Sequence, residues 1–155
     1  MLCEGEKAID FELPDSAGKP VRLSDFTGKL IILYFYPRDN TPGCTKEACS
    51  FRDAFSELTA AGAEIIGISP DSISQHQSFA DKYNLKFHLL SDTSHTVTAK
   101  YGAWGMKKLY GKQYYGIIRS TFIIEGTFHI LKVYPKVSPG GHADEILQFI
   151  KTYKE

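Results

Sequence analysis

The residues best suited to take part in a chemical reaction lie in one short stretch, residues 36–49. Thr41 is suited to cap the N-terminus of a helix, Pro42 is well tolerated at the first helical position, and Cys44 then falls in the first turn. Free backbone N–H groups and the positive end of the helix dipole favour a thiolate there. The pattern therefore predicts a nucleophilic Cys44, against the alternative of a cysteine buried as a small hydrophobe.

Catalysis by such a thiolate requires more than its ionisation. A larger thiolate fraction at pH 7 supplies roughly 30-fold, about 2 kcal/mol, and enzymatic rate enhancements are larger. The rest must come from donors aimed at charge that develops in the transition state. The available donors are the Thr41 hydroxyl, the N–H groups of Gly43 and Cys44, and the guanidinium of Arg119. Arg119 opens a later strand, where the alternative is a surface ion pair.

A second cysteine, Cys49, follows five residues after Cys44 on the same expected helix. Ideal helix geometry separates their Cα atoms by about 8 to 9 Å, beyond the roughly 7 Å that a disulfide can bridge. If the two cysteines pair, the first turns of this helix must unwind. The alternative is that Cys49 is a helix residue that never reacts.

The elements that must position these residues follow a β-α-β-α rhythm. Residues 30–36 form a continuous apolar run that ends at Pro37, which predicts a strand buried on both faces at the centre of a sheet. Helical spacing then predicts one helix from Thr41 to the stop at Gly62. A strand at 65–68 and a helix at 74–83 follow, and this alternation indicates a parallel core.

The flanking segments complete the prediction of a single α/β domain over residues 1–155. A turn at 14–18 between short alternating segments predicts a small N-terminal hairpin. Further along the chain we expect a strand at 87–90, a short helix at 95–101, an aromatic loop at 102–116, an antiparallel pair at 119–124 and 129–134, and a final helix at 143–153. The result is a central mixed β-sheet flanked by helices.

The active stretch resembles that of the peroxiredoxins, whose pattern of proline, three residues, threonine, two residues and cysteine is met by Pro37, Thr41 and Cys44. Longer matches at 34–37, 40–45 and 119–124, together with Cys49, are similar to the bacterioferritin comigratory protein or Q-type (PrxQ) branch. The resemblance runs from residue 5 to residue 150. It implies a thioredoxin-like fold with an N-terminal β-hairpin extension, and thiol-dependent reduction of hydrogen peroxide and organic hydroperoxides.

The resemblance also implies a role for individual residues. Cys44 matches the peroxidatic cysteine, which becomes a sulfenic acid. Thr41 and Arg119 match the groups that hold the peroxide and the thiolate, and Pro37 matches the residue that shields the pocket from water. Glu47 matches a helix acid that often orients the arginine.

In this branch a cysteine at the position of Cys49 resolves the sulfenic acid within one chain, and thioredoxin or a similar dithiol then reduces the disulfide. Many members act as monomers, and no cofactor is implied. No cysteine follows Cys49, which argues against a two-chain mechanism. Cys3 departs from the branch pattern; we expect an incidental exposed thiol, with resolution of Cys44 or a bridge between two chains as alternatives.

Composition excludes several other classes of protein. The 155 residues carry 18 basic and 18 acidic side chains with a pI near 7.0, which argues against a nucleic-acid or membrane binder. The longest apolar run has seven residues, whereas a membrane span needs about 20. No targeting signal is visible and the three cysteines are an odd number, so we expect a cytoplasmic protein with reduced thiols.

Three alternative functions are less consistent with the sequence. A metal site is disfavoured because the five histidines show no paired ligand spacing; we expect them on surfaces or at helix caps. A thioredoxin-like disulfide exchanger would normally carry Cys-x-x-Cys. A non-enzymatic redox sensor or holdase, in which oxidation unfolds the helix, would consume about one peroxide per chain and stop. The aromatic and lysine-rich segment 104–115 is interpreted as a lip beside the active site or a packed surface loop.

Overall fold

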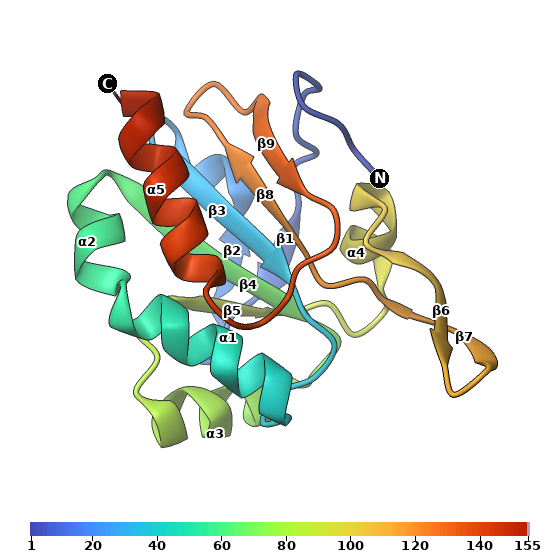
Figure 1. Ribbon diagram of the computed structural model, residues 1–155. Coiled ribbons are helices and arrows are strands. Elements are labelled where there is room, and N and C mark those ends of the chain that lie inside the picture. Colours follow the sequence, from blue (N-terminus) through green and yellow to red (C-terminus); the bar gives the residue numbers. More distant parts are fainter. Residues whose placement is uncertain (155) are drawn as a thin grey trace.

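Five strands form the central sheet of the computed structural model, which describes residues 1–154 (Figure 1). In spatial order they are β5 (His88–Ser91), β4 (Ala63–Ser69), β3 (Leu30–Phe35), β8 (Ser120–Ile124) and β9 (Ile130–Tyr134). The pairs β3–β4 and β4–β5 are parallel, whereas β3–β8 and β8–β9 are antiparallel. The predicted mixed sheet is confirmed, with β3 at its centre.

The buried run of β3 explains this central place. All six of its residues are buried, so both faces of the strand need cover. Ile31, Leu33 and Phe35 belong to one hydrophobic cluster, and Ile32 and Tyr34 belong to the other. The alternation of side chains along a strand thus divides the core into two layers, one on each face of the sheet.

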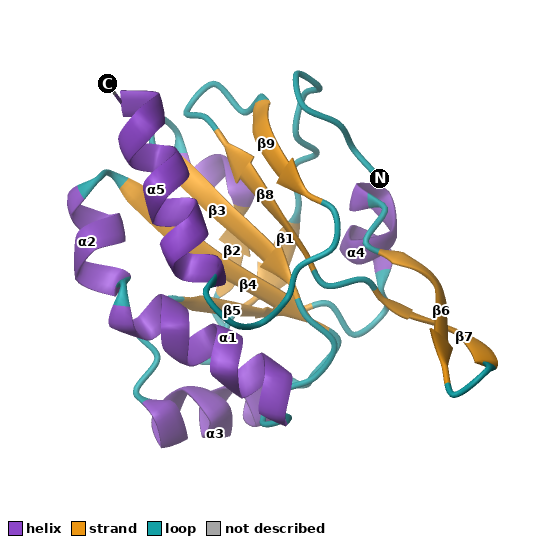
Figure 2. Cartoon of the chain, in the orientation of Figure 1, coloured by secondary structure: helices purple, strands orange, loops and turns teal. Residues whose placement is uncertain are grey.

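Helices cover both faces (Figure 2). One core layer contains side chains of α1 (Pro42–Asp53), α2 (Phe55–Ala60), α3 (Ile73–Tyr83) and α5 (His142–Lys154). The other contains side chains of the 3₁₀ helix η1 (Leu23–Phe26), α4 (Thr96–Tyr101) and the N-terminal segment. That segment includes the predicted hairpin, β1 (Glu12–Pro14) paired with β2 (Pro20–Arg22). Within residues 1–154, no helix combines the length and apolar character needed to cross a membrane.

The single helix expected from Thr41 to Gly62 is wrong. The structure divides it into α1 and α2 at Ala54, whose ψ of 2° lies outside the helical range. Ala54 is small and buried, and Phe51 and Leu58 on either side of the bend stay in the core. The bend lets both side chains pack against the sheet. The sequence around Ala54 contains no glycine or proline from which a break could be predicted.

The aromatic loop expected at 102–116 is also wrong, because this segment is a two-stranded hairpin. β6 (Trp104–Leu109) pairs with β7 (Lys112–Ile117) through a turn at Tyr110 and Gly111, both with positive φ. Such a two-residue turn matches the twist of paired strands, but Tyr-Gly is a weaker signal than Asn-Gly. The hairpin projects from the body of the molecule (Figure 1).

Strand register positions the two ends of the candidate site. Phe35, at the end of β3, pairs with Ser120, at the start of β8. Arg119 therefore lies at the same edge of the sheet as the loop that runs from β3 into α1. Residues 75 positions apart in the chain, Cys44 and Arg119, are brought together by this antiparallel pairing.

We predict that Gly67→Ala destabilises the fold. Gly67 faces Tyr34 across β3 and β4, and an added Cβ would lie 2.9 Å from atoms of the buried Tyr34 ring. Overpacking of this kind costs about 1–3 kcal/mol. Urea denaturation measures the loss. Gly140→Ala is the matched control, because its Cβ would meet only the flexible end of Lys46; equal stability of the two variants would contradict the packing argument.

Candidate active site

Cys44 lies in the first turn of α1, as the sequence predicts. Thr41 occupies the N-cap position and Pro42 is the first helical residue. Only 2% of Cys44 is exposed, and it belongs to the same core layer as Tyr34 and Phe51. The sulfur is thus almost withdrawn from water at the positive end of a helix, where an anion is favoured.

The expected role of Thr41 is only partly met. Its backbone caps the helix, since Thr45 N donates to Thr41 O at 2.8 Å. Its side chain makes no capping hydrogen bond; the hydroxyl donates instead to Arg38 O at 2.9 Å. This bond closes the turn before the helix. The hydroxyl oxygen still has lone pairs that can accept a hydrogen bond from a bound ligand.

Arg119 supplies the guanidinium that the sequence analysis sought. Its Nη2 donates to Cys44 Sγ at 3.2 Å, and its Nη1 donates to Glu47 Oε1 at 2.7 Å. Burial by itself lowers the pKa of Arg119, but the neighbouring Glu47 and Cys44 outweigh it, so the pKa is raised. One planar fork of donors thereby connects both groups on α1, and the arginine is not a surface ion pair.

Glu47 is fully buried beneath this contact. Burial raises its pKa from 4.5 to about 7, although the charge and hydrogen bond of Arg119 act in the opposite direction. Its second oxygen, Oε2, is buried and has no hydrogen-bond partner among the described residues. Glu47 thus contacts one nitrogen of the guanidinium while the other nitrogen faces the sulfur.

Gly43 leaves room for the guanidinium. A Cβ on Gly43 would lie 3.3 Å from Arg119 Nη2 and 3.3 Å from Pro139 Cγ. A side chain here would press on the atom that contacts Cys44. The glycine therefore has a steric reason beside the N–H donor role expected from the sequence.

The other predicted residues, Pro37, Cys49 and Cys3, differ in how exposed they are. Pro37 is half-buried, between the buried Tyr36 and the exposed Arg38. Cys49 is half-buried on α1, and the thiols of Cys3, Cys44 and Cys49 are all free. Cys3 is exposed, in an N-terminal segment that hydrogen bonds to α4 and β9 and whose Leu2 packs in the core layer opposite to that of Cys44.

Comparison with known proteins connects this geometry to a family. The AhpC/TSA family model matches residues 5–133. The chain is 52% identical over 143 residues to a putative peroxiredoxin Bcp of Coxiella burnetii, covering 92% of this chain and 95% of that protein. It is 47% identical over 151 residues to peroxiredoxin Bcp of Bacillus subtilis, covering 97% and 96%. The chain belongs to the Bcp/PrxQ peroxiredoxins of the AhpC/TSA family.

Solved structures agree with this assignment. The bacterioferritin comigratory protein of Xanthomonas campestris is 35% identical with a TM-score of 0.88, covering 94% of this chain and 92% of that one. A mutant of PrxQ from Xylella fastidiosa is 32% identical with a TM-score of 0.95, covering 100% and 99%. The predicted thioredoxin-like fold is confirmed. This peroxiredoxin is a thiol peroxidase, which acts on a hydroperoxide and needs a thiol reductant.

Lys107 is a cation of this peroxiredoxin's site that the sequence analysis missed. Burial and the charge of Arg119 lower the pKa of Lys107, while Cys44 acts in the opposite direction. Its Nζ donates to Ile117 O at 2.8 Å. Lys107 and Arg119 line one cavity of about 550 Å³. Hairpin β6–β7 thus borders a cavity that Arg119 also lines. No local pattern distinguishes Lys107 from its neighbour Lys108.

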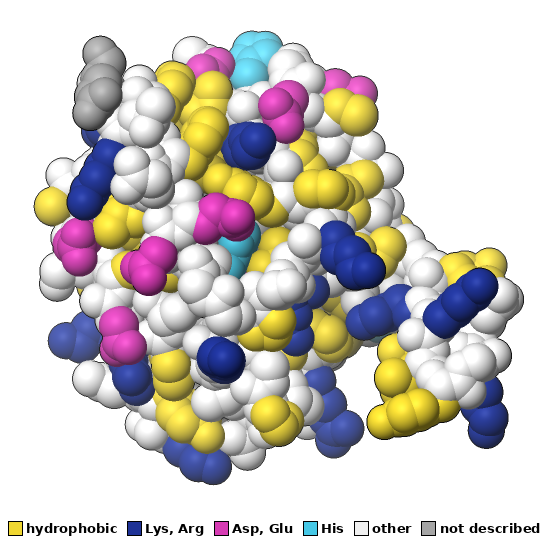
Figure 3. Space-filling view, viewed as in Figure 1, with side chains coloured by type: hydrophobic (Ala, Val, Ile, Leu, Met, Phe, Trp, Pro, Cys, Tyr) yellow, Lys and Arg dark blue, Asp and Glu magenta, His cyan; other side chains and the backbone are white. Residues whose placement is uncertain are grey.

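The hairpin also exposes several large hydrophobic side chains. Its exposed hydrophobic residues stand among lysines (Figure 3). They are Met106, Leu109, Tyr110, Tyr114 and Tyr115.

The expectation that the histidines lie on surfaces or at caps is wrong for two of the five. His142 is buried at the start of α5, where its Nε2 lies 2.8 Å from Thr121 Oγ1 and its Nδ1 lies 3.0 Å from Glu145 Oε1. Burial lowers its pKa. His76 is also fully buried, on α3. Both rings fill core positions where hydrogen-bond partners are available, which spacing along the chain does not reveal.

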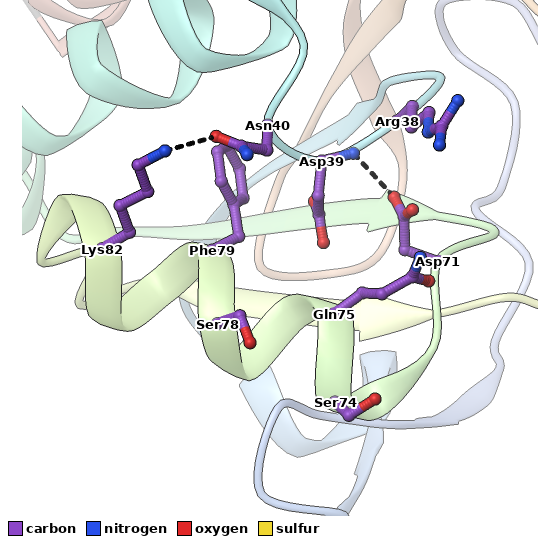
Figure 4. Close-up of a pocket in the computed structure, with 9 residues that line it drawn as sticks. All are labelled: Arg38, Asp39, Asn40, Asp71, Ser74, Gln75, Ser78, Phe79 and Lys82. Carbon is purple, nitrogen blue, oxygen red and sulfur yellow. Dashed lines mark hydrogen bonds between the residues drawn. The ribbon is translucent and has the colours of Figure 1, made fainter.

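His76 belongs to a buried cluster with Asp39 and Asp71, whose candidate ligand atoms lie within 4.8 Å of one another. A metal interpretation is weak, because both oxygens of Asp39 and both nitrogens of His76 are already engaged in short contacts within the protein. The cluster borders a cavity of about 370 Å³ between the loop after β3 and α3 (Figure 4). Its members are a hydrogen-bonded network behind the active-site loop.

Glu47 predicts a pH dependence of stability. A carboxyl whose pKa is raised from 4.5 to about 7 in the folded state stabilises the fold below pH 4.5 and loses that contribution as pH rises to 7. Relative to Glu47→Gln, which does not titrate, the unfolding free energy of the wild type should fall by about 3 kcal/mol over this range and stay level above it. Urea denaturation of both proteins from pH 4.5 to pH 8 measures the difference, and a constant difference would contradict it.

Arg119→Lys should slow the reaction with hydroperoxide. A single ammonium cannot reach Cys44 and Glu47 with the fixed geometry of two guanidinium donors. Losing one donor to the transition state costs on the order of 10²-fold in rate. Stopped-flow measurement of peroxide consumption tests this. Arg22→Lys, at an exposed ion pair with Glu12, is the control and should react at the wild-type rate.

Proposed function

We propose that this peroxiredoxin reduces hydrogen peroxide and organic hydroperoxides through Cys44, resolves the oxidised sulfur with Cys49 in the same chain, and is recycled by thioredoxin or a similar dithiol protein. One observation carries the assignment of Cys44: its sulfur, in the first turn of α1, lies 3.2 Å from Arg119 Nη2. Cys3 and Cys49 have no such neighbour among the described contacts.

The first step is attack of the Cys44 thiolate on one oxygen of the peroxide. An S–O bond forms, the O–O bond breaks, and the other oxygen leaves as hydroxide or alkoxide and takes a proton. The sulfur is oxidised to a sulfenic acid and the peroxide is reduced to water or an alcohol. Arg119 and the N–H groups of Gly43 and Cys44 stabilise the developing negative charge. Thr41 orients the peroxide by accepting a hydrogen bond from its O–H group, and Pro37 limits the access of water.

The second step requires α1 to open. α1 is continuous from Pro42 to Asp53, so Cys44 and Cys49 stand about 8 to 9 Å apart at their Cα atoms by helix geometry. The first turns must unwind before the Cys49 thiol can condense with the sulfenic acid, which releases water and forms the disulfide. A dithiol reductant then restores both thiols by exchange and becomes a disulfide itself.

The enzyme needs neither a second chain nor a cofactor for these two steps. The pairing of Cys44 with Cys49 needs no second chain, so the protein acts as a monomer and as one domain. Neither step uses a metal or an organic cofactor. The three thiols suit the cytoplasm, where protein thiols are kept reduced.

Two cysteine variants test the mechanism. Cys44→Ser should abolish peroxide consumption, because the nucleophile is lost. Cys49→Ser should consume about one equivalent of peroxide at the wild-type rate and then stop with thioredoxin as reductant, because no disulfide forms for it to reduce. Coupled turnover and mass-spectrometric mapping of the Cys44–Cys49 bond provide the measurement, with Cys3→Ser as the matched control.

The alternative functions give different results. A redox sensor or holdase would stop after one equivalent in the wild type even with reductant present. Full steady-state activity of Cys44→Ser would exclude the assignment of the nucleophile. A disulfide that includes Cys3 in the turning-over wild type would transfer the resolving role from Cys49 to Cys3.

A further inference from the structure

The loop that leads into the active site is fastened to α3 by buried side chains. Asp39, five residues before Cys44, directs its Oδ2 at His76 Nδ1 over 2.6 Å. The Asp39 backbone N–H donates to Asp71 Oδ2 at 2.8 Å, and Tyr36 Oη donates to Asp39 Oδ1 at 2.6 Å. His76 is not exposed at all. The loop is thus attached to the start of α3 by contacts that involve neither Cys44 nor Arg119.

The protons of this network can be counted. His76 Nε2 lies 3.0 Å from Leu90 O, which can only accept, so Nε2 must carry a hydrogen. The 2.6 Å contact between Nδ1 and Asp39 needs one further proton, held by either partner. The contact is therefore either a charge-assisted hydrogen bond or a short neutral bond to a carboxylic acid. In both cases it is buried, so losing it would leave a polar group without a partner and cost free energy.

The α3 side of this contact is the fixed side. Ser72 and Gln75 form a capping box at the start of α3, and Phe79 of the same helix packs in the core. The Leu90 O contact ties His76 to the end of β5 as well. The α3 side therefore has anchors of its own, whereas the loop must move when α1 unwinds.

The loop side carries backbone strain. Asn40 has a φ of 60°, a left-handed conformation that costs most residues about 1 kcal/mol or more and that asparagine adopts more readily than other non-glycine residues. Its side-chain oxygen accepts from Lys82 Nζ and from Tyr83 Oη, both at 3.3 Å and both on α3 (Figure 4 shows Lys82). The strained conformation is held by α3 at two places, Asp39 and Asn40. Without these contacts the loop would relax, and the first turn of α1 continues directly from it.

We propose that His76 is a positioning residue whose contact with Asp39 latches the active-site loop to α3 and so sets the balance between closed and open forms of the start of α1. The inference rests on the proposed function, because it assigns the closed form to peroxide reduction and the open form to disulfide formation. A tight latch keeps Cys44 against Arg119, and a loose one lets Cys49 reach it sooner.

Two isosteric variants separate the two contacts of His76. In His76→Asn the amide nitrogen takes the place of Nδ1 and can donate to the Asp39 carboxylate, so a contact with Asp39 is kept. In His76→Gln the amide nitrogen takes the place of Nε2, so the Leu90 O contact is kept and the latch is lost. Removing a buried hydrogen bond of this kind should shift the opening equilibrium on the order of tenfold.

The test follows disulfide formation in a single turnover with hydrogen peroxide. In His76→Gln the rate of Cys44–Cys49 formation should rise on the order of tenfold, and the peroxide concentration that overoxidises half of Cys44 should rise with it. The reaction of Cys44 with peroxide should not accelerate. His76→Asn should resemble the wild type. A merely destabilising change in the core, Ile146→Val in α5, should lower the denaturation midpoint without altering these rates.

Hydrogen exchange in the reduced protein provides a readout that needs no disulfide. The amides of Asp39 and Thr45 are hydrogen bonded in the closed form and should exchange on the order of tenfold faster in His76→Gln. Asp39→Asn tests the same contact from the loop if His76→Gln does not fold. The latch would be overturned if His76→Gln left both the amide exchange rates and the rate of Cys44–Cys49 formation unchanged. Equal effects of His76→Asn and His76→Gln would also overturn it. If the wild type formed no Cys44–Cys49 disulfide with peroxide while His76→Gln still exchanged its amides faster, the proposed function alone would be overturned.

Discussion

The active site depends on a guanidinium that is shared between a sulfur and a buried carboxyl. Arg119 contacts Cys44 on one side and Glu47 on the other, and both belong to the first turns of α1. Burying any of these groups alone would be costly. Together they compensate one another, and the cost of burial remains visible in Glu47, whose pKa rises to about 7 despite its partner. The rest of the fold is needed to keep this set in place.

The proposed mechanism places two competing requirements on the start of α1. Attack on a peroxide needs the sulfur held against fixed donors, whereas a bond to Cys49 needs the same turns to come apart. The structure provides holding contacts on both sides of the segment. Arg119 holds Cys44 from β8, and the network around Asp39 and His76 holds the preceding loop from α3. The same loop contains Asn40, whose φ of 60° lies in the left-handed region and whose side chain contacts α3.

Much of the fold could be predicted because its signals are local. The apolar run of β3 predicts a central strand, and Thr41, Pro42 and Cys44 place a cysteine in a first helical turn. The bend at Ala54 could not be predicted, since it answers to packing of Phe51 and Leu58 against the sheet. Hairpin β6–β7 was missed because the Tyr-Gly turn lacks the usual residues. The burial of His76 and His142 depends on partners far along the chain.

Local sequence signals identify the candidate nucleophile, a second cysteine too far away for a disulfide within an intact helix, and the alternation of strands and helices. These follow from neighbouring residues, whose backbone geometry is set by short-range sterics and hydrogen bonding. The surroundings of the sulfur, in contrast, follow from long-range contacts in the folded chain. The pairing of β3 with β8 brings Arg119 to Cys44, the hairpin adds Lys107, and α3 supplies His76 behind the loop. Electrostatic contacts depend on distance in space, and the chain order of these groups contains no such distance.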